Sequence, residues 1–102
     1  PVIIAGDFNA HSEGWSCSPQ QRDRRVDTLI GWAAGLGLIL MNEGSESTCV
    51  RPGGNGASVI DLTWATPLAA GLFHEWKVEA EGETLSDHRH IVWTLHLPKP
   101  QQ

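Results

Sequence analysis

The sequence predicts one α/β domain in which a mixed β-sheet is covered by a long helix. An apolar, partly β-branched run opens the chain at residues 1–5, helical apolar spacing follows over 26–34, and strand-like alternation fills much of 58–97. The 102 residues suffice for a single domain with a thin core. A hydrophobic share of 40% and a charged share of 19% are ordinary for globular chains, which argues against wholesale disorder.

The first third of the chain predicts a strand, a loop and a helix. Residues 1–5 have the composition of a buried strand that ends at Gly6, and a loop rich in Gly, Ser, Asn and Asp follows. Ser18, Pro19 and Gln21 are typical of a helix start, with a capping serine, a proline in the first turn and a glutamine three residues after the cap. The apolar face of this helix is formed by Val26, Leu29, Ile30, Ala33 and Ala34, and the helix is expected to end at Gly35 or Gly37.

The rest of the chain predicts short strands joined by tight loops. We expect strands over 38–41, 48–50, 58–65, 72–80 and 88–97, a Gly-rich loop over 51–57, a turn or short helical piece over 66–71, and a polar tail over 98–102. In the 58–65 strand, Leu62 and Trp64 lie on one face, and Asp61 and Thr63 on the other. Both faces of several strands are apolar, so the sheet needs cover on its second face, and the chain has no second long helix to supply it.

The net charge argues against nonspecific electrostatic binding of nucleic acid by the chain as a whole. The formal charge is −5 and the isoelectric point is near 5.4, so we expect weak nonspecific DNA affinity. Phosphate chemistry would need a local site, with a metal cation reversing the field. No apolar run approaches the roughly 18 residues of a membrane span. Cys17 and Cys49 lack zinc-ligand spacing and are expected to be reduced, structural thiols.

Three polar motifs stand where predicted strands begin or end. Gly6-Asp7-Phe8-Asn9 follows the first strand, Asp61 lies inside an apolar strand, and Ser86-Asp87-His88 leads into the last strand. A buried carboxylate is costly without a partner, and a histidine beside a carboxylate suggests an oriented imidazole. The alternatives stay open: Asp7 and Asn9 would cap a turn, Asp61 would bond a backbone group or hydroxyl, and His88 would be an ordinary surface histidine.

Taken in order, these motifs resemble the C-terminal half of the endonuclease/exonuclease/phosphatase superfamily. The segment Gly6-Asp7-Phe8-Asn9-Ala10-His11 and the segment Ser58-Val59-Ile60-Asp61-Leu62-Thr63 are most similar to the endonuclease domain of non-LTR retrotransposons, within endonuclease/reverse transcriptase polyproteins. The helix followed by Gly37-Leu38-Ile39-Leu40-Met41-Asn42 and the final Ser86-Asp87-His88 complete the pattern. The resemblance implies about half of a four-layer α/β/β/α sandwich of the DNase-I-like type over residues 1–97, with 98–102 as a tail.

The resemblance also implies a site and a reaction. It implies a fragment of a Mg²⁺-dependent phosphodiesterase, with Mn²⁺ as a substitute, which nicks target DNA to leave a 3′-hydroxyl primer and acts inside the cell, in the nucleus. The catalytic residues it implies are Asp7, Asn9, Asp61 and His88. Asp7 would orient or deprotonate the attacking water, or assist the leaving oxygen. Asn9 and His88 would contact the phosphate, and Asp61 would orient the imidazole. The phosphate-binding or supporting residues it implies are Thr48, Ser58 and Ser86, and Asp87 would ligate metal.

Part of the family's site is missing from this sequence. The family's principal metal ligands, a Glu and an Asn, and a helpful Tyr come from the N-terminal half, and this chain contains no Tyr. We therefore expect the 102 residues to be a poor nuclease alone. The uncovered sheet face would be closed by the N-terminal half of the same domain or by a second copy in a homodimer. DNA is the expected substrate, and no membrane partner is expected.

Other functions remain open from sequence alone. The chain would suit another phosphohydrolase of the superfamily, acting on RNA, inositol phosphates or lipid head groups, or a non-catalytic dimerising module. A transition-metal site that uses His11, His74, His88, His90 and His96 is a further interpretation, since the last three share one face of the last predicted strand. Among the tryptophans, Trp15 in the loop near the first motif is the one considered as a base-stacking platform, and the others are expected to pack the core.

Overall fold

The computed structural model of the chain describes residues 1–15, 25–51, 56–81 and 84–97. Its elements in chain order are β1 (Ile3–Asp7), η1 (Glu13–Trp15), α1 (Arg25–Gly35), β2 (Ile39–Leu40), β3 (Cys49–Val50), β4 (Ala57–Ser58), β5 (Asp61–Ala65), α2 (Pro67–Ala70), β6 (Phe73–Glu79) and β7 (His90–Leu95). Every predicted strand and the long helix are present. The predicted helix start at Ser18, Pro19 and Gln21 lies outside the described residues, as do Cys17 and the tail over 98–102.

A three-stranded antiparallel sheet forms the centre of the molecule. Its strand order is β1-β5-β2, with β5 in the middle and antiparallel to both neighbours. The registers pair Ile4 with Trp64 and Leu40 with Trp64, so these side chains lie on one face. Thr63 pairs with Ala5 and lies on the opposite face. The α/β class predicted from the sequence is confirmed, but the described strands pair antiparallel throughout, so the prediction of a mixed sheet is wrong.

Helix α1 covers the face that carries Leu62 and Trp64. Val26 and Ala33 are the buried residues of this helix, and they belong to the same core cluster as both β5 residues. Trp15 also packs here: its ring stands edge-on to Trp64, its indole N–H donates to the carbonyl of Ala10 at 3.0 Å, and it is 5% exposed. The idea that Trp15 is a base-stacking platform is therefore wrong. Trp32, which was expected in the core, lies at the surface of α1 with 38% of its area exposed.

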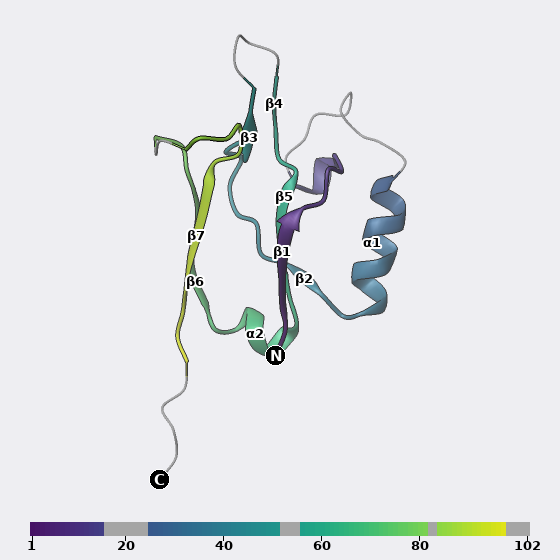
Figure 1. The fold of residues 1–102 in the computed structure, drawn as a ribbon. Helices are drawn as coiled ribbons and strands as arrows, with labels where there is room; N and C mark the ends of the chain where they lie inside the picture. Colours follow the sequence, from purple (N-terminus) through teal and green to yellow (C-terminus); the bar gives the residue numbers. More distant parts are fainter. Residues whose placement is uncertain (16–24, 52–55, 82–83, 98–102) are drawn as a thin grey trace.

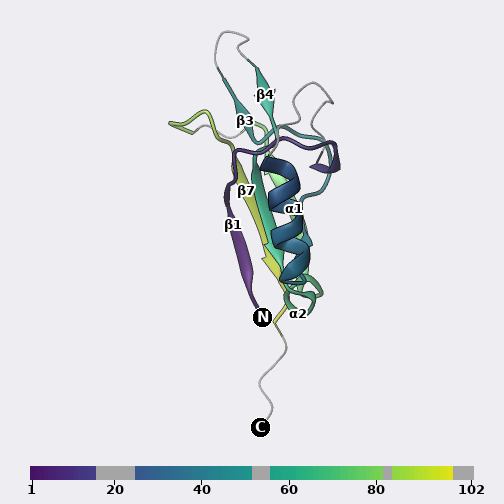
Figure 2. The same ribbon diagram turned by 90° about the vertical axis from the view of Figure 1, so that its right-hand side faces the viewer.

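The β6–β7 hairpin lies against the other face of the central sheet. Figures 1 and 2 show three layers in the order α1, central sheet and hairpin. The buried indole of Trp76 on β6 donates to the hydroxyl of Thr63 on β5 at 3.1 Å, joining the two layers. The expectation that nothing in the chain covers this second face is therefore wrong. The cover is a hairpin of a second sheet instead of a helix.

A β-bulge in β6 changes which side chains face the sheet. The β6–β7 register shifts between His74 and Lys77, and Glu75 has a positive φ of 57°. Simple alternation over 72–80 would place Trp76 on the same face as His74. The extra residue at the bulge moves His74, but not Trp76, to the exposed side. The sequence carries no glycine at this position that would have indicated the bulge.

The predicted strand over 58–65 is divided between two sheets. Ser58 in β4 pairs with Cys49 in β3, whereas Asp61 in β5 pairs with Asp7 in β1. Val59 and Ile60 lie between the two strands and are buried. The short β3–β4 hairpin thus leaves the central sheet at the same end as Asp7 and Asp61 (Figure 1). None of the helices in the described ranges is long and apolar enough to cross a membrane.

The Trp76–Thr63 contact predicts how strongly the two layers depend on each other. In Thr63→Val the indole N–H stays buried without a partner, so the free energy of unfolding should fall by about 1–3 kcal/mol. Urea unfolding followed by tryptophan fluorescence measures this change. Thr94→Val is the matched control, because Thr94 lies exposed on β7 and should change stability little. Equal losses in both variants would contradict a specific role for the buried bond.

Candidate functional site

Two carboxylates face each other at one end of the central sheet. Asp7 ends β1 and Asp61 begins β5, and the antiparallel register places them directly opposite, on the same face. Like charges in this position repel and destabilise a strand pair. The pairing continues one step further, because the amide of Phe8 donates to the carbonyl of Ile60 at 2.9 Å. The sheet therefore holds both acids in place despite their repulsion.

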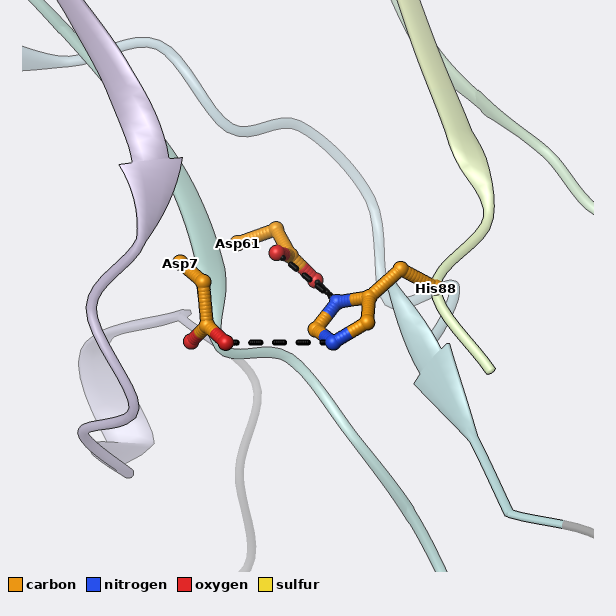
Figure 3. Close-up of side chains that lie close together, drawn as sticks. All are labelled: Asp7, Asp61 and His88. Atoms are coloured by element: carbon orange, nitrogen blue, oxygen red, sulfur yellow. Dashed lines mark hydrogen bonds and ion pairs between the residues drawn. The ribbon is translucent and has the colours of Figure 1, made fainter. Parts of the chain in front are cut away.

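His88 lies between these two carboxylates, where its protonated form offsets their charge. Its Nδ1 is 2.8 Å from Oδ2 and 3.0 Å from Oδ1 of Asp61, and its Nε2 is 3.8 Å from Oδ2 of Asp7 (Figure 3). The hydrogen bond to Asp61 raises the pKa of His88, burial opposes the rise, and the charges of Asp61, Asp7 and Asp87 add to it. The imidazole is thus fixed through one nitrogen, while the other faces Asp7. Of the readings left open for His88 and Asp61, the oriented imidazole is the one that the structure shows.

The turn after β1 fixes Asp7 and Asn9 relative to each other. The amide of Asn9 donates to Oδ1 of Asp7 at 2.8 Å, which forms an Asx turn. Asn9 has φ of 47°, a left-handed conformation that asparagine adopts more readily than most residues. One oxygen of Asp7 is therefore committed to the turn, and the other faces His88. Turn capping and a role at the site are compatible for this residue.

Two side chains hold the backbone of Asp61 from either side. The buried hydroxyl of Thr48 accepts hydrogen bonds from the amides of Ile60 and Asp61, both at 3.1 Å. The side-chain amide of Asn42 donates to the carbonyl of Asp61 at 3.1 Å, and its oxygen accepts from the amide of Thr63 at 2.8 Å. Thr48 is completely buried, so it supports the site and does not contact phosphate. Asn42 lies in the segment whose sequence resembles the family, but the sequence patterns assigned it no role at the site.

The segment before β7 brings His88 to the carboxylates. His88 forms an isolated antiparallel bridge with Cys49, so its backbone pairs with the β3–β4 hairpin before β7 begins. The amide of Arg89 donates to the carbonyl of Thr48 at 2.7 Å, and the hydroxyl of Ser86 accepts from the amide of His88 at 3.1 Å. Cys49 is a buried free thiol whose pKa is raised by burial and by the nearby acids. Its role here is structural.

The structure brings together some of the predicted site residues and not others. Asp7, Asp61 and His88 form one cluster with ligand-type atoms within 4.8 Å of one another, and Asn9 adjoins it through the Asx turn. Ser86 supports His88 through its backbone, and half-buried Ser58 lines a neighbouring groove with Asn9. Asp87 is exposed and lies outside the cluster, in a second groove with Ser86 and Arg89.

The histidines of the last strand do not form a metal site of their own. Within the described ranges, the one group of three such ligands contains His88 and neither His90 nor His96. His96 instead stacks on His74 with ring centroids 3.7 Å apart, and His90 lies 4.0 Å from Glu79. His88 precedes β7, and its imidazole is bound to Asp61. The transition-metal reading of these three residues is therefore wrong.

The oxygen donors around His88 fit a hard divalent cation. Asp7 has an oxygen free of the Asx turn, whereas Asp87, the residue before His88 in the chain, is an exposed carboxylate outside the cluster. Mg²⁺ is usually held by one or two carboxylates together with waters and substrate phosphate, which is the kind of donor set present here. Both carboxylate oxygens of Asp61 lie within hydrogen-bond distance of Nδ1 of His88. Asp61 and His88 therefore bind each other and are not assigned as ligands of the ion.

Fold and site together define a half of an α/β/β/α nuclease-type domain. The model of a family described as endonuclease-reverse transcriptase matches residues 1–92, and the chain belongs to this family. Among solved structures, the endonuclease domain of TRAS1, a telomere-specific non-LTR retrotransposon, is similar with a TM-score of 0.81 and 34% identity over 95% of this chain. No curated protein matches it. The resemblance inferred from the motifs is confirmed.

This likeness covers only part of the TRAS1 domain. The chain spans 44% of the length of that structure. The described residues form helices α1 and α2, one three-stranded sheet and the two hairpins β3–β4 and β6–β7. This likeness alone therefore does not assign the activity of the complete domain to this chain.

The His88–Asp61 pair predicts a measurable titration in metal-free buffer. His88 binds its proton more tightly in the folded than in the unfolded state, so the pair's contribution to the free energy of unfolding is full below about pH 6.5 and is lost as pH rises through the folded pKa. Proton NMR should show His88 titrating above the ordinary histidine value. In Asp61→Asn the pKa should fall, whereas Glu79→Gln, beside exposed His90, should leave it unchanged.

The contacts of Thr48 predict a separate effect. Thr48→Val leaves the amides of Ile60 and Asp61 without their side-chain acceptor, so unfolding free energy should fall by about 1–3 kcal/mol and the elevated pKa of His88 should drop as Asp61 loosens. Thr48→Ser keeps the hydroxyl and should restore the pKa. An unchanged His88 titration in the valine variant would show that Thr48 does not position Asp61.

Proposed function

We propose that this chain is the C-terminal half of an endonuclease domain that hydrolyses one phosphodiester bond in target DNA and leaves a 3′-hydroxyl. The observation that supports this most strongly is the imidazole of His88, bound through Nδ1 to Asp61 with Nε2 directed at Asp7. Membership of the endonuclease-reverse transcriptase family supports the reaction class. Acting on chromosomal DNA, the domain would work in the nucleus.

The residues of the cluster divide the reaction between them. A water oxygen attacks phosphorus, the bond from phosphorus to the 3′-oxygen breaks, and that oxygen takes up a proton. Asp7, which has an oxygen free of the Asx turn, accepts the proton of the water or orients it. His88, whose raised pKa favours the imidazolium, donates from Nε2 to a phosphoryl oxygen and stabilises the charge that grows there.

Two further groups complete the arrangement. The side chain of Asn9, exposed beside Asp7, hydrogen-bonds the scissile phosphate and limits its rotation. Asp61 keeps the imidazole in orientation and does not touch the substrate. Asp87, together with carboxylates from the rest of the domain, would hold a Mg²⁺ ion, or Mn²⁺ in its place, which when bound neutralises phosphoryl charge and lowers the pKa of water.

The proposed partner is the remaining part of the same domain. Several apolar side chains of the β6–β7 hairpin remain half-buried, although Phe73 and Trp93 stack with ring centroids 5.6 Å apart. Ile91, Trp93 and Leu95 share one face of β7, and the pairing of Ile91 with Val78 makes this the face that Trp76 turns toward the central sheet. The hairpin is a sheet of two strands, and the TRAS1 domain has more than twice the length of this chain, so further strands are available to widen this sheet and complete the burial of these side chains. A second copy of this chain is the alternative partner.

A plasmid nicking assay tests the proposed function. The 102-residue chain with Mg²⁺ should convert supercoiled plasmid to open circle slowly or not at all, and adding an N-terminal half from a relative's endonuclease domain should restore nicking. His88→Ala should then lower the restored rate about 10²–10³-fold, and EDTA should abolish it. His90→Ala is the matched control, because His90 lies outside the cluster.

Several outcomes would contradict this account. Fast Mg²⁺-dependent nicking by the chain alone, lost in His88→Ala, would show that the 102 residues suffice for a working site. Restored cleavage of RNA, inositol phosphate or phospholipid substrates but not DNA would assign another phosphohydrolase activity. Dimerisation seen by light scattering, without nicking after the N-terminal half is added, would favour a non-catalytic module.

A further inference from the structure

A small polar groove opens directly beside the cluster of Asp7, Asp61 and His88. Its volume is about 230 Å³, and its lining includes Asn9, His11, Arg51, Gly56 and Ser58. Asn9 belongs to the turn that holds Asp7, so this residue connects the groove to the reacting centre. The groove lies between the turn after β1 and the β3–β4 hairpin, with Arg51 and Gly56 at the loop end of that hairpin.

The guanidinium of Arg51 gives this groove a positive charge. In an acidic chain of net charge −5, a local cation decides where a phosphate can bind. Of the other Lys and Arg residues in the described ranges, Arg89 is bound to Glu46 at 3.3 Å and to the carbonyl of Ser47 at 2.9 Å. Lys77 lies exposed on β6, and Arg25 begins α1 and does not line the groove. Arg51 is exposed, and no salt bridge within the described ranges neutralises it.

The backbone around Arg51 is fixed. Its amide donates to the carbonyl of Gly56 at 2.9 Å, one step beyond the Val50–Ala57 pair, toward the loop end of the hairpin. Gly56 has φ of 117°, where any other residue would be strained, and it leaves open space where a side chain would stand. The hairpin therefore holds the start of the arginine side chain at the groove wall, opposite Asn9 and His11.

The size and chemistry of the groove select the class of ligand. Whole small-molecule ligands usually occupy cavities of about 300–1,000 Å³, so a groove of 230 Å³ suits a smaller unit such as one phosphate with part of its sugar. A guanidinium binds phosphate oxygens through two parallel hydrogen bonds, and imidazole, amide and hydroxyl groups supply further donors. The lining contains each of these groups.

We infer that this groove is a subsite for a second backbone phosphate of the substrate strand, next to the scissile one, with Arg51 as its principal donor. The inference rests on the proposed function, because it assumes that a nucleic-acid strand crosses the cluster. Arg51 binds the neighbouring phosphate. This contact fixes the position of the strand so that the scissile phosphate lies at Asn9 and His88. It contacts the strand without taking part in proton transfer, so it contributes to binding.

Binding of a short probe tests this subsite in the 102-residue chain itself. The 5′-phosphorylated thymidine dinucleotide pTpT is titrated into the ¹⁵N-labelled protein, and amide shifts are followed by NMR. Saturable shifts are expected at Asn9, His11 and Gly56. Arg51→Gln should weaken pTpT binding about ten-fold or more, as expected for one hydrogen-bonded charge. Lys77→Gln, which removes an equal charge from exposed β6, should change it less than two-fold.

Nicking by the assembled two-half domain separates this inference from the proposed function. Arg51→Gln should raise KM for DNA and lower the salt dependence of binding by about one phosphate contact, with a smaller effect on kcat. If pTpT binds at Arg51 but the assembled domain does not nick DNA, the subsite stands and the proposed function fails. If the domain nicks and Arg51→Gln matches Lys77→Gln in both assays, the subsite is wrong. Failure of pTpT to shift these amides in the unmodified chain also overturns it.

Discussion

The hydrogen bond between His88 and Asp61 is the interaction on which the rest of the site depends. Without it, two carboxylates would face each other across β1 and β5 with no imidazole held between them. With it, the imidazole is held in one orientation and its second nitrogen is directed at Asp7. The same bond raises the pKa of His88, so the charge that offsets the acids is also the charge a phosphate would meet.

The groups that meet at this hydrogen bond come from separate parts of the fold. Asp7 and Asp61 come from paired strands of the central sheet, whereas His88 comes from a segment attached to the β3–β4 hairpin. Thr48 links these parts, because its hydroxyl binds the backbone of Asp61 while its carbonyl accepts the amide of Arg89. The Trp76–Thr63 contact joins the second sheet to β5 two residues beyond Asp61. Packing and site are therefore coupled along one short strand.

Sequence patterns were sufficient for the elements and for the central residues of the site. Apolar periodicity located the strands and α1, and a carboxylate inside an apolar strand correctly indicated that Asp61 needs a partner. Three features of the structure could not be predicted from the sequence. The bulge at Glu75 depends on how β6 pairs with β7. The strand breaks after Ser58 because residues before the break pair with β3 and residues after it pair with β1. Trp15 is buried because it packs against Trp64. Each is a tertiary effect that local alternation does not encode.

The central claim is that Asp61 holds the imidazole of His88 through Nδ1, and the tautomer of that ring tests it most directly. Long-range ¹H–¹⁵N correlation spectra recorded above the pKa of His88 distinguish which ring nitrogen keeps its proton. The account predicts the proton on Nδ1, bonded to Asp61, with Nε2 free to face Asp7. A ring protonated at Nε2 in the folded chain would contradict it, because Asp61 would then not be orienting the imidazole.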